Sequence, residues 1–436
     1  MKAGPGGGPA GPLPVWVLSN GLAEDMVGAR LAVELVDRGR HLVSVTGVPL
    51  LATPAGVEDP YYRASRAGVR VLDASRLNLP SGGFGRLRLS AARQDWQAGW
   101  WPGTRGWLAT LAADVRACRR SGHEVAGAFV CVGDSYLLFL AAWARRKARR
   151  AAGGGGGEVF PIYFVPTAKS ELLRGHFLAE YALMKRVARS VFPRDAATAA
   201  ALKRHGVPAA YLGNPLLDVG GAAEAAEARA RRRPAENGQA VITIGLLPGS
   251  RADWRENLDK LRLVEEALAK RRPEVAWRFL VSAPLARPEP ARDTDVPPEG
   301  ERESFVPFSE LLARADLVVG MAGTAHEQAA ALGLPVVAFP GGRIQYTAAF
   351  ARAQKRLLGP ALALLPPDPE AVAGHVLAIL DDPERRRQMA AAGRERMGSP
   401  GGVAAIAGAV LADLIPIAGL IPAAGPTPTA EGASHR

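Results

Sequence analysis

The chain has 436 residues, of which 48% are hydrophobic and 22% are charged, and its 54 Lys and Arg residues outnumber 42 Asp and Glu residues to give a net charge of +12. This composition is typical of a globular, soluble protein, and the length exceeds that of one hydrophobic core, so we expect two domains. The positive charge favours contact with a nucleotide, an anionic membrane surface or nucleic acid, although an arginine-rich proteome would produce the same excess.

The cysteines, the N-terminus and the apolar runs exclude further classes of protein. Cys118 and Cys131 are the only cysteines and their spacing fits no metal site, which favours a reducing compartment. Residues 1–14 lack the apolar core of a signal peptide, and we expect them to form a tail. The longest apolar run begins at Val403, but Asp413 and two prolines interrupt it, which predicts a packed helix and not a membrane span.

In the first half of the chain, short apolar runs alternate with amphipathic stretches. The runs are rich in β-branched residues, and most are followed by Gly, Ser, Thr or Asp. In chain order they are VWVLSN from Val15, HLVSVTGVP, VRVLDAS, VAGAFVCVGD, VFPIYFVPT and RSVFPRD. The alternation predicts a doubly wound domain over residues 15–213, with a parallel sheet covered by helices on both faces.

A charged segment, AAEAAEARARRRPAENGQ, marks the junction to a second series of runs. These are AVITIGLLPGSR, AWRFLVSAP, ADLVVGMAG, LPVVAFPGG and LALLPPD, and they predict a second α/β domain over residues 214–400. We expect a helix over residues 401–424 and a tail over residues 425–436. Two doubly wound domains that face each other present the carboxyl ends of their strands to one cleft, where such folds bind ligands.

Two strand-end loops of the second domain carry residues suited to a diphosphate. In LLPGSR, Gly249 and Ser250 let backbone N–H groups approach an anion and Arg251 adds charge, although an ordinary turn with a solvated arginine has the same sequence. In FPGGRIQYT, Gly342 and Gln345 offer backbone and side-chain amides in the same way. Neither of these strand-end loops carries a DxD-like pair of carboxylates, so we expect the anion to be held without a metal ion.

A third loop, AGTAHEQ, places Gly323 and Thr324 at the start of a helix, where unpaired N–H groups and the helix dipole favour a phosphate. Glu327 and Gln328 follow about one turn later and are suited to hydrogen bonds with ribose or sugar hydroxyls. We expect His326 to lie near the same ligand as a first-turn residue and not to bind a metal. A helix N-cap with an acidic first turn would give the same pattern without any ligand.

An ordered set of segments runs from about Val15 to about Pro366: SNGLAEDMVGARL, VGDSYLLF, FVPTAKSE, RSVFPRD, YLGNPLLD, LLPGSR and GMAGTAHEQAAALGLPVVAFPGG. In this order they resemble the landmark segments of lipid-A-disaccharide synthase, and more closely those of the lipid-A-disaccharide synthase-related proteins. The resemblance implies the GT-B fold of metal-independent, inverting glycosyltransferases. It also implies that the second domain holds a nucleotide-sugar donor, that the first holds the acceptor, and that the last helix crosses back to the first domain.

The resemblance suggests roles for single residues of the first domain. Asp134, in VGDS, occupies the position of the synthase aspartate regarded as the catalytic base. Such a base is needed because a neutral hydroxyl attacks an anomeric carbon poorly until its proton is accepted. Asp25, in LAED, matches an aspartate of the synthase's N-terminal motif at the same cleft mouth. We assign Asn20 and Gly21, from the loop before it, to the acceptor side.

Two positions depart from the family's pattern. Asn214 stands where the synthase usually has a histidine, so a histidine role cannot be transferred there. Gln328 stands where related enzymes have a glutamate that grips the donor. An amide both donates and accepts hydrogen bonds whereas a carboxylate only accepts them, so the identity of the donor sugar is in question.

Four of the eight tryptophans lie close together in QDWQAGWWPGTRGWLATL, namely Trp96, Trp100, Trp101 and Trp107. With arginines nearby, such rings suit a membrane interface, where the rings lie at headgroup depth and the cations near phosphates. The alternative is that the rings fill the core of the first domain. The flanking Gly and Pro make it difficult for one element to bury all four rings, which favours the interface.

These patterns predict an α/β protein of the GT-B fold that acts as an inverting glycosyltransferase. The expected reaction moves a UDP-linked sugar, expected to be a hexosamine, onto a lipid acceptor at an anionic membrane surface, on its cytoplasmic face. We expect no cofactor and no nucleic acid partner. A nucleotide-sugar epimerase of the same fold and a non-catalytic membrane or nucleic-acid binding protein are the alternatives.

Overall fold

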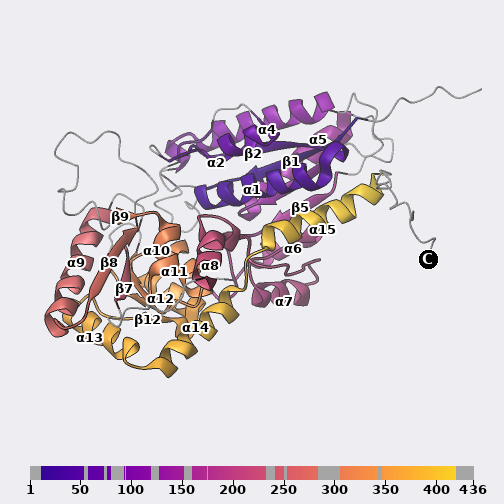
Figure 1. Ribbon diagram of the computed structural model, residues 1–436. Coiled ribbons are helices and arrows are strands. Elements are labelled where there is room, and N and C mark those ends of the chain that lie inside the picture. Colours follow the sequence, from indigo (N-terminus) through magenta and orange to yellow (C-terminus); the bar gives the residue numbers. More distant parts are fainter. Residues whose placement is uncertain are drawn as a thin grey trace, which may run out of the picture.

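The folded chain consists of two α/β domains, each built on a sheet of parallel strands, and a C-terminal helix lies along the first domain (Figure 1). The structure is a computed structural model. It describes residues 11–53, 57–72, 76–79, 93, 95–118, 127–151, 160–173, 175–231, 241–249, 253–282, 305–341 and 346–418. The tail predicted for residues 425–436 lies outside these ranges, and the first strand begins at Leu13, just inside the other predicted tail.

The first domain is built on a parallel six-stranded sheet with the order β3-β2-β1-β4-β5-β6. Its strands are β1 (Leu13–Ser19), β2 (Val43–Pro49), β3 (Arg70–Val71), β4 (Ala128–Val132), β5 (Ile162–Val165) and β6 (Ser190–Val191). Its helices are α1 (Leu22–Gly39), α2 (Pro60–Arg66), α4 (Trp100–Cys118), α5 (Ser135–Ala151), α6 (Leu178–Val187) and α7 (Ala196–Arg204). Because successive strand residues point to opposite faces, Trp16 and Leu18 enter one core and Val15 and Val17 enter another. Helices cover both faces of this sheet, as predicted.

The second domain repeats the plan with the order β12-β11-β10-β7-β8-β9, again with all strands parallel. Its strands are β7 (Ile242–Leu247), β8 (Trp277–Ser282), β9 (Phe305–Val306), β10 (Leu317–Gly320), β11 (Val336–Ala338) and β12 (Leu362–Leu364). Its helices are α8 (Ala222–Ala230), α9 (Trp254–Arg271), α10 (Phe308–Arg314), α11 (Thr324–Ala331), α12 (Ala348–Leu358), α13 (Pro369–Leu380) and α14 (Pro383–Met397). The strand order reverses between β1 and β4 in the first sheet and between β7 and β10 in the second, and such points are where these folds bind ligands.

The last helix, α15 (Gly402–Ile417), returns to the first domain and packs against α1 (Figure 1). Its apolar face joins the core behind β1, through Val403, Ile406, Val410, Leu411 and Leu414. By length and composition the continuous segment Pro383–Ile417 could cross a membrane. The chain nevertheless bends between α14 and α15, where Gly398 and Gly401 have positive φ, and α15 buries its apolar residues within the protein. A helix that packs back on the first domain is therefore confirmed.

Two segments cross between the domains side by side. The first contains a 3₁₀ turn, Pro215–Asp218, whose start is capped by Asn214 Oδ1, which accepts from the Leu216 N–H at 3.2 Å. Asn214 Nδ2 donates to the Met397 carbonyl oxygen at 3.0 Å, at the beginning of the second crossing. Asp218 accepts from the Val403 N–H at 2.6 Å. Asn214 therefore fastens the two crossings to each other.

Candidate functional site

The loops after β1 and β4 bring two of the predicted residues into contact at the point where the strand order reverses. Asn20 Nδ2 donates to Asp134 Oδ1 at 3.0 Å, and the Tyr136 N–H donates to the same oxygen at 2.9 Å. Gly133, between β4 and Asp134, has a φ of 143°, and a Cβ there would lie 2.1 Å from Asn20 Oδ1. The close approach of the two loops thus requires glycine and fixes the orientation of the Asp134 carboxylate.

A pocket opens beside this carboxylate. Its lining combines three polar residues with an apolar wall: Asn20, Asp134 and Tyr136 with Leu50, Leu51, Leu77, Leu79 and Trp100. An apolar wall next to a fixed carboxylate suits a molecule that has a hydroxyl group at one end and an apolar body.

Three of the four clustered tryptophans continue this wall to the surface. The Trp100 ring centroid lies 6.1 Å from that of Trp96 and 6.1 Å from that of Trp101. Trp96 is 60% exposed and Trp101 is 44% exposed. Trp107 is only 3% exposed and belongs to the core of the first domain, so the prediction that it contacts a membrane is wrong. The reason is helical spacing, because Trp107 follows Trp100 by about two turns of α4 and so shares its inward face.

The acidic pair at the start of α1 divides between two environments. Asp25 is buried, Oδ1 has no hydrogen-bond donor within the described part of the chain, and burial raises its pKa to about 7. Its charged neighbours are Glu24, Arg76 and Asp59, and it is enclosed beside Ser19 at the carboxyl end of β1. Burial also raises the pKa of Glu24, and this is the carboxyl group on which the charge of Asp134 acts.

The donor loops predicted in the second domain are described in part. Gly249 follows β7 with a φ of 89°, a conformation that favours glycine, whereas Ser250, Arg251, Gly342 and Gln345 lie outside the described residues. Gly323 is the N-cap of α11, where no side chain caps the helix, and Thr324 is exposed at its first position. The N-cap alternative is therefore not realised by Thr324, and α11 follows β10, which pairs with β7, the strand that precedes Gly249.

His326 is a buried, neutral residue with a defined tautomer. Burial lowers its pKa to about 4. Gln354 Nε2 donates to the Gly323 carbonyl oxygen at 2.8 Å, so Gln354 Oε1, which also accepts from Tyr346 Oη at 2.6 Å, must accept the proton of His326 Nδ1 at 2.9 Å. His326 therefore helps to orient the side chain of Gln354, which in turn holds the Gly323 carbonyl group before α11. Within the described residues, no three His, Cys, Asp or Glu side chains are grouped as a metal site requires.

Glu327 and Gln328 do not point into open space. The Glu327 carboxylate forms an ion pair with Arg194 of the first domain. Gln328 Nε2 donates to the carbonyl oxygens of Leu216 and Val219, each at 2.8 Å, in the segment that joins the domains. A glutamate could not donate these two bonds, which explains the amide at this position. The structure thus gives Gln328 a different role from the predicted reading of sugar hydroxyls.

Comparison with known proteins gives a relative by sequence and several by fold. No protein-family model matches the chain. Lipid-A-disaccharide synthase of Azoarcus sp. (strain BH72) is 34% identical over 180 residues, which are 37% of this chain and 43% of that protein's length. The calicheamicin glycosyltransferase CalG4 superposes with a TM-score of 0.56 at 16% identity, covering 94% of this chain and 100% of CalG4. The chain has a glycosyltransferase-like GT-B fold.

The same GT-B fold is found in a second kind of enzyme. UDP-GlcNAc 2-epimerase from Neisseria meningitidis, solved with UDP-GlcNAc bound, superposes with a TM-score of 0.54 at 14% identity. The superposition covers 93% of this chain and 100% of the epimerase. At such identities the likeness shows the fold, and the choice between the two chemistries depends on the residues of the site.

Three residues of this GT-B site were missed by the reading of the sequence: Glu24, Thr167 and Arg194. Each follows a strand end of the first sheet or begins the next helix, and each is buried. Glu24 gave a weak signal as the neighbour of Asp25. Arg194 gave none, because a single arginine after a strand has the same sequence pattern as a solvated one.

Proposed function

We propose that the protein is an inverting glycosyltransferase that moves a sugar from a UDP-sugar onto a hydroxyl group of a lipid acceptor, without a metal ion. The observation that carries the proposal is the Asp134 carboxylate, held by Asn20 beside an apolar pocket at the strand-order reversal of the first sheet. The similarity to a lipid-A-disaccharide synthase and the GT-B fold support the same reaction class.

In the proposed reaction, Asp134 accepts the proton of the acceptor hydroxyl as its oxygen attacks the anomeric carbon. A new carbon–oxygen bond forms on one face of the sugar while the bond to the UDP phosphate oxygen breaks on the other, so the configuration inverts. The leaving diphosphate gains negative charge. The amides at Gly323 and Thr324, at the start of α11, would stabilise it, together with the loop of Gly249, Ser250 and Arg251.

The lining of the acceptor pocket supports a lipid substrate. Leucines and Trp100 form its wall, and the exposed rings of Trp96 and Trp101 extend that wall outward. Tryptophans at a surface favour the headgroup region of a membrane, where an acyl chain could stay in the bilayer while its sugar or headgroup hydroxyl reached Asp134. We therefore propose that the protein works at the cytoplasmic face of a membrane.

Incubation of the protein with labelled UDP-hexosamines, with and without a native lipid extract, tests the proposal. We expect release of UDP and labelling of lipid only when both substrates are present. Asp134→Asn keeps the acceptor of the Asn20 hydrogen bond but removes the base, and we expect the rate to fall by about 10²- to 10⁴-fold.

Two results would contradict the transferase. If no UDP-sugar gives labelled lipid or free UDP, no transfer reaction takes place. If the sugar nucleotide is instead isomerised in the absence of lipid, and Asp134→Asn abolishes that reaction, the site belongs to an epimerase.

A further inference from the structure

Arg194 joins the two domains from a buried position. It follows β6 in the first domain and is 5% exposed. Its Nη1 donates to the Thr167 carbonyl oxygen at 3.2 Å, and its Nη2 donates to the carboxylate of Glu327 on α11 of the second domain. Glu327 is 8% exposed. A buried arginine and a buried glutamate need each other, because either charge alone in such a place is costly.

The same polar path continues to the proposed base. Thr167 Oγ1 donates to Glu24 Oε1 at 3.2 Å. The charges of Asp134 and Arg194 both act on Glu24, the former raising and the latter lowering its pKa. A line of contacting polar groups therefore runs from the surroundings of Asp134, through Glu24, Thr167 and Arg194, to α11.

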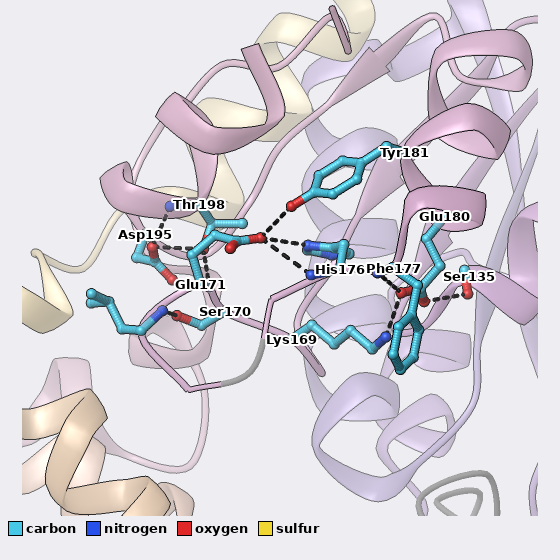
Figure 2. Close-up of polar contacts among 11 residues, drawn as sticks. Ser135, Lys169, Ser170, Glu171, His176, Phe177, Glu180, Tyr181, Asp195 and Thr198 are labelled. Atoms are coloured by element: carbon cyan, nitrogen blue, oxygen red, sulfur yellow. Dashed lines mark hydrogen bonds and ion pairs between the residues drawn. The ribbon is translucent and has the colours of Figure 1, made fainter. Parts of the chain in front are cut away.

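The backbone on both sides of this path is held in place by two hydrogen-bond clusters, around Glu171 and Glu180, which meet at the adjacent residues His176 and Phe177 (Figure 2). Ser135, next to Asp134, donates to Glu180 Oε1 at 2.9 Å. Asp195, next to Arg194, caps α7 by accepting from the Thr198 N–H at 2.7 Å. The loop between them is fixed by Glu171, whose N–H donates to Thr198 Oγ1 at 3.0 Å and whose carboxylate accepts from Tyr181 Oη at 2.7 Å. The residues next to Asp134 and Arg194 are therefore both held by hydrogen bonds within the first domain.

Helix α11 is fastened at adjacent residues to two different parts of the chain. Glu327 binds Arg194 of the first domain, while Gln328 binds the segment between the domains. The amide end of this helix is where the proposed function puts the donor diphosphate. A helix fastened in this way cannot change its distance from Asp134 without breaking the buried ion pair.

We propose that Arg194 is a positioning residue that sets the distance between the donor helix α11 and the base Asp134 by binding Glu327 across the domain boundary. The expected effect on the rate of transfer rests on the proposed function, whereas the expected effect on the distance between the domains does not. Arg194 binds the second domain through the side chain of Glu327 and not through the amide end of α11, so we expect its loss to change the alignment of donor and acceptor and to leave the binding of UDP to the second domain intact.

The structural consequence is tested without any turnover. Lys203 and Glu266 are exposed, and each lies in a different domain. Cysteines at these two positions, in a Cys118→Ser background, can carry spin labels, and pulsed electron paramagnetic resonance then measures the distance between the domains. We expect Arg194→Gln to broaden the distance distribution, and Arg194→Lys, which keeps the charge, to broaden it less.

The matched control breaks an exposed ion pair within the second domain. Arg271 Nε lies 2.9 Å from Glu370 Oε2, and Arg271→Gln is expected to leave the distances unchanged. If Arg194→Gln does not fold, Glu327→Gln removes the same ion pair from the other side and should broaden the distribution. A distribution equal to that of the wild type in a folded variant of either residue would overturn the proposal.

The kinetic consequence is tested by comparing kcat for transfer with the dissociation constant of UDP from calorimetry. We expect Arg194→Gln to lower kcat by about 100-fold, as a misplacement of about 1 Å does, and to change UDP affinity less than about threefold. Arg194→Lys should recover part of the rate. A loss of UDP affinity that accounts for the whole loss of rate would overturn the positioning role, and absence of transfer in the wild type would count against the proposed function alone.

Discussion

Replacing Gln328 with glutamate tests whether its amide holds the segment that joins the domains. The side chain is 4% exposed, and its Nε2 donates to the Leu216 and Val219 carbonyl oxygens at 2.8 Å each. The substitution replaces the Nε2 donor with a carboxylate oxygen, which would face the two carbonyl oxygens without a hydrogen to share. Two hydrogen bonds contribute about 2 kcal/mol net, and the buried groups left without a donor add on the order of 1 kcal/mol.

We therefore expect Gln328→Glu to lower the free energy of unfolding by about 3 kcal/mol at pH 8. In a domain of this size that corresponds to a fall of about 6 to 12 °C in the midpoint of thermal unfolding. The introduced carboxyl group is buried, so its pKa in the folded protein is raised above the unfolded value of about 4.3. A group with a raised folded pKa contributes most below its unfolded pKa and loses that contribution as pH rises through the folded pKa, so the defect should be smaller at pH 5 than at pH 8.

Thermal unfolding followed by circular dichroism at both pH values is the assay. Gln97→Glu, at an exposed position of the first domain, is the control for the added charge. A midpoint for Gln328→Glu within a degree or so of the wild type at pH 8 would refute the reasoning, because it would mean that the two carbonyl contacts contribute nothing to stability.

Three further predictions concern the surface, the C-terminal helix and metal ions. Trp101→Ser should weaken binding to anionic lipid vesicles in a sedimentation assay without changing thermal stability, whereas Trp107→Ala should cost about 3 to 5 kcal/mol because it empties part of the core. Arg189 lowers the pKa of Asp413 on α15, so their pairing stabilises above the unfolded pKa and is lost as pH falls through the folded one. Arg189→Gln should therefore lower the free energy of unfolding slightly at pH 7, by no more than about 1 kcal/mol for an exposed pair, and should have no effect at a pH below the folded pKa of Asp413. Release of UDP should be unaffected by EDTA.

The fold could be predicted because its signals are local. Each buried strand is a short β-branched run, and the alternation of Trp16 with Val15 and Val17 on β1 reflects the two faces that helices cover. The Asp134 end of the site could be predicted for the same reason. Asp134 follows a strand directly, and parallel strands place their carboxyl ends at one edge, where Asn20 follows the neighbouring strand.

Arg194 could not be found in this way, because its meaning depends on a residue 133 positions later. Its immediate neighbours, a strand end and the cap of α7, are the same whether the side chain is solvated or buried. Asp25 shows the opposite case. Its type and position matched a family motif, but the helix turned Glu24 toward the charges of Asp134 and Arg194 and turned Asp25 toward Ser19. Which of two adjacent acids faces the site is a matter of helical phase, which the motif does not specify.

The same phase argument accounts for Glu327 and Gln328. Adjacent residues of a helix point in directions about 100° apart, so both could not read one sugar. On α11 one direction meets the first domain and the other meets the joining segment, and each side chain has the chemistry that its own surroundings require. The carboxylate faces a guanidinium, and the amide faces two carbonyl oxygens. The glutamine at this position therefore fits the way in which the two domains are joined, and it gives no information about the donor sugar of the proposed reaction.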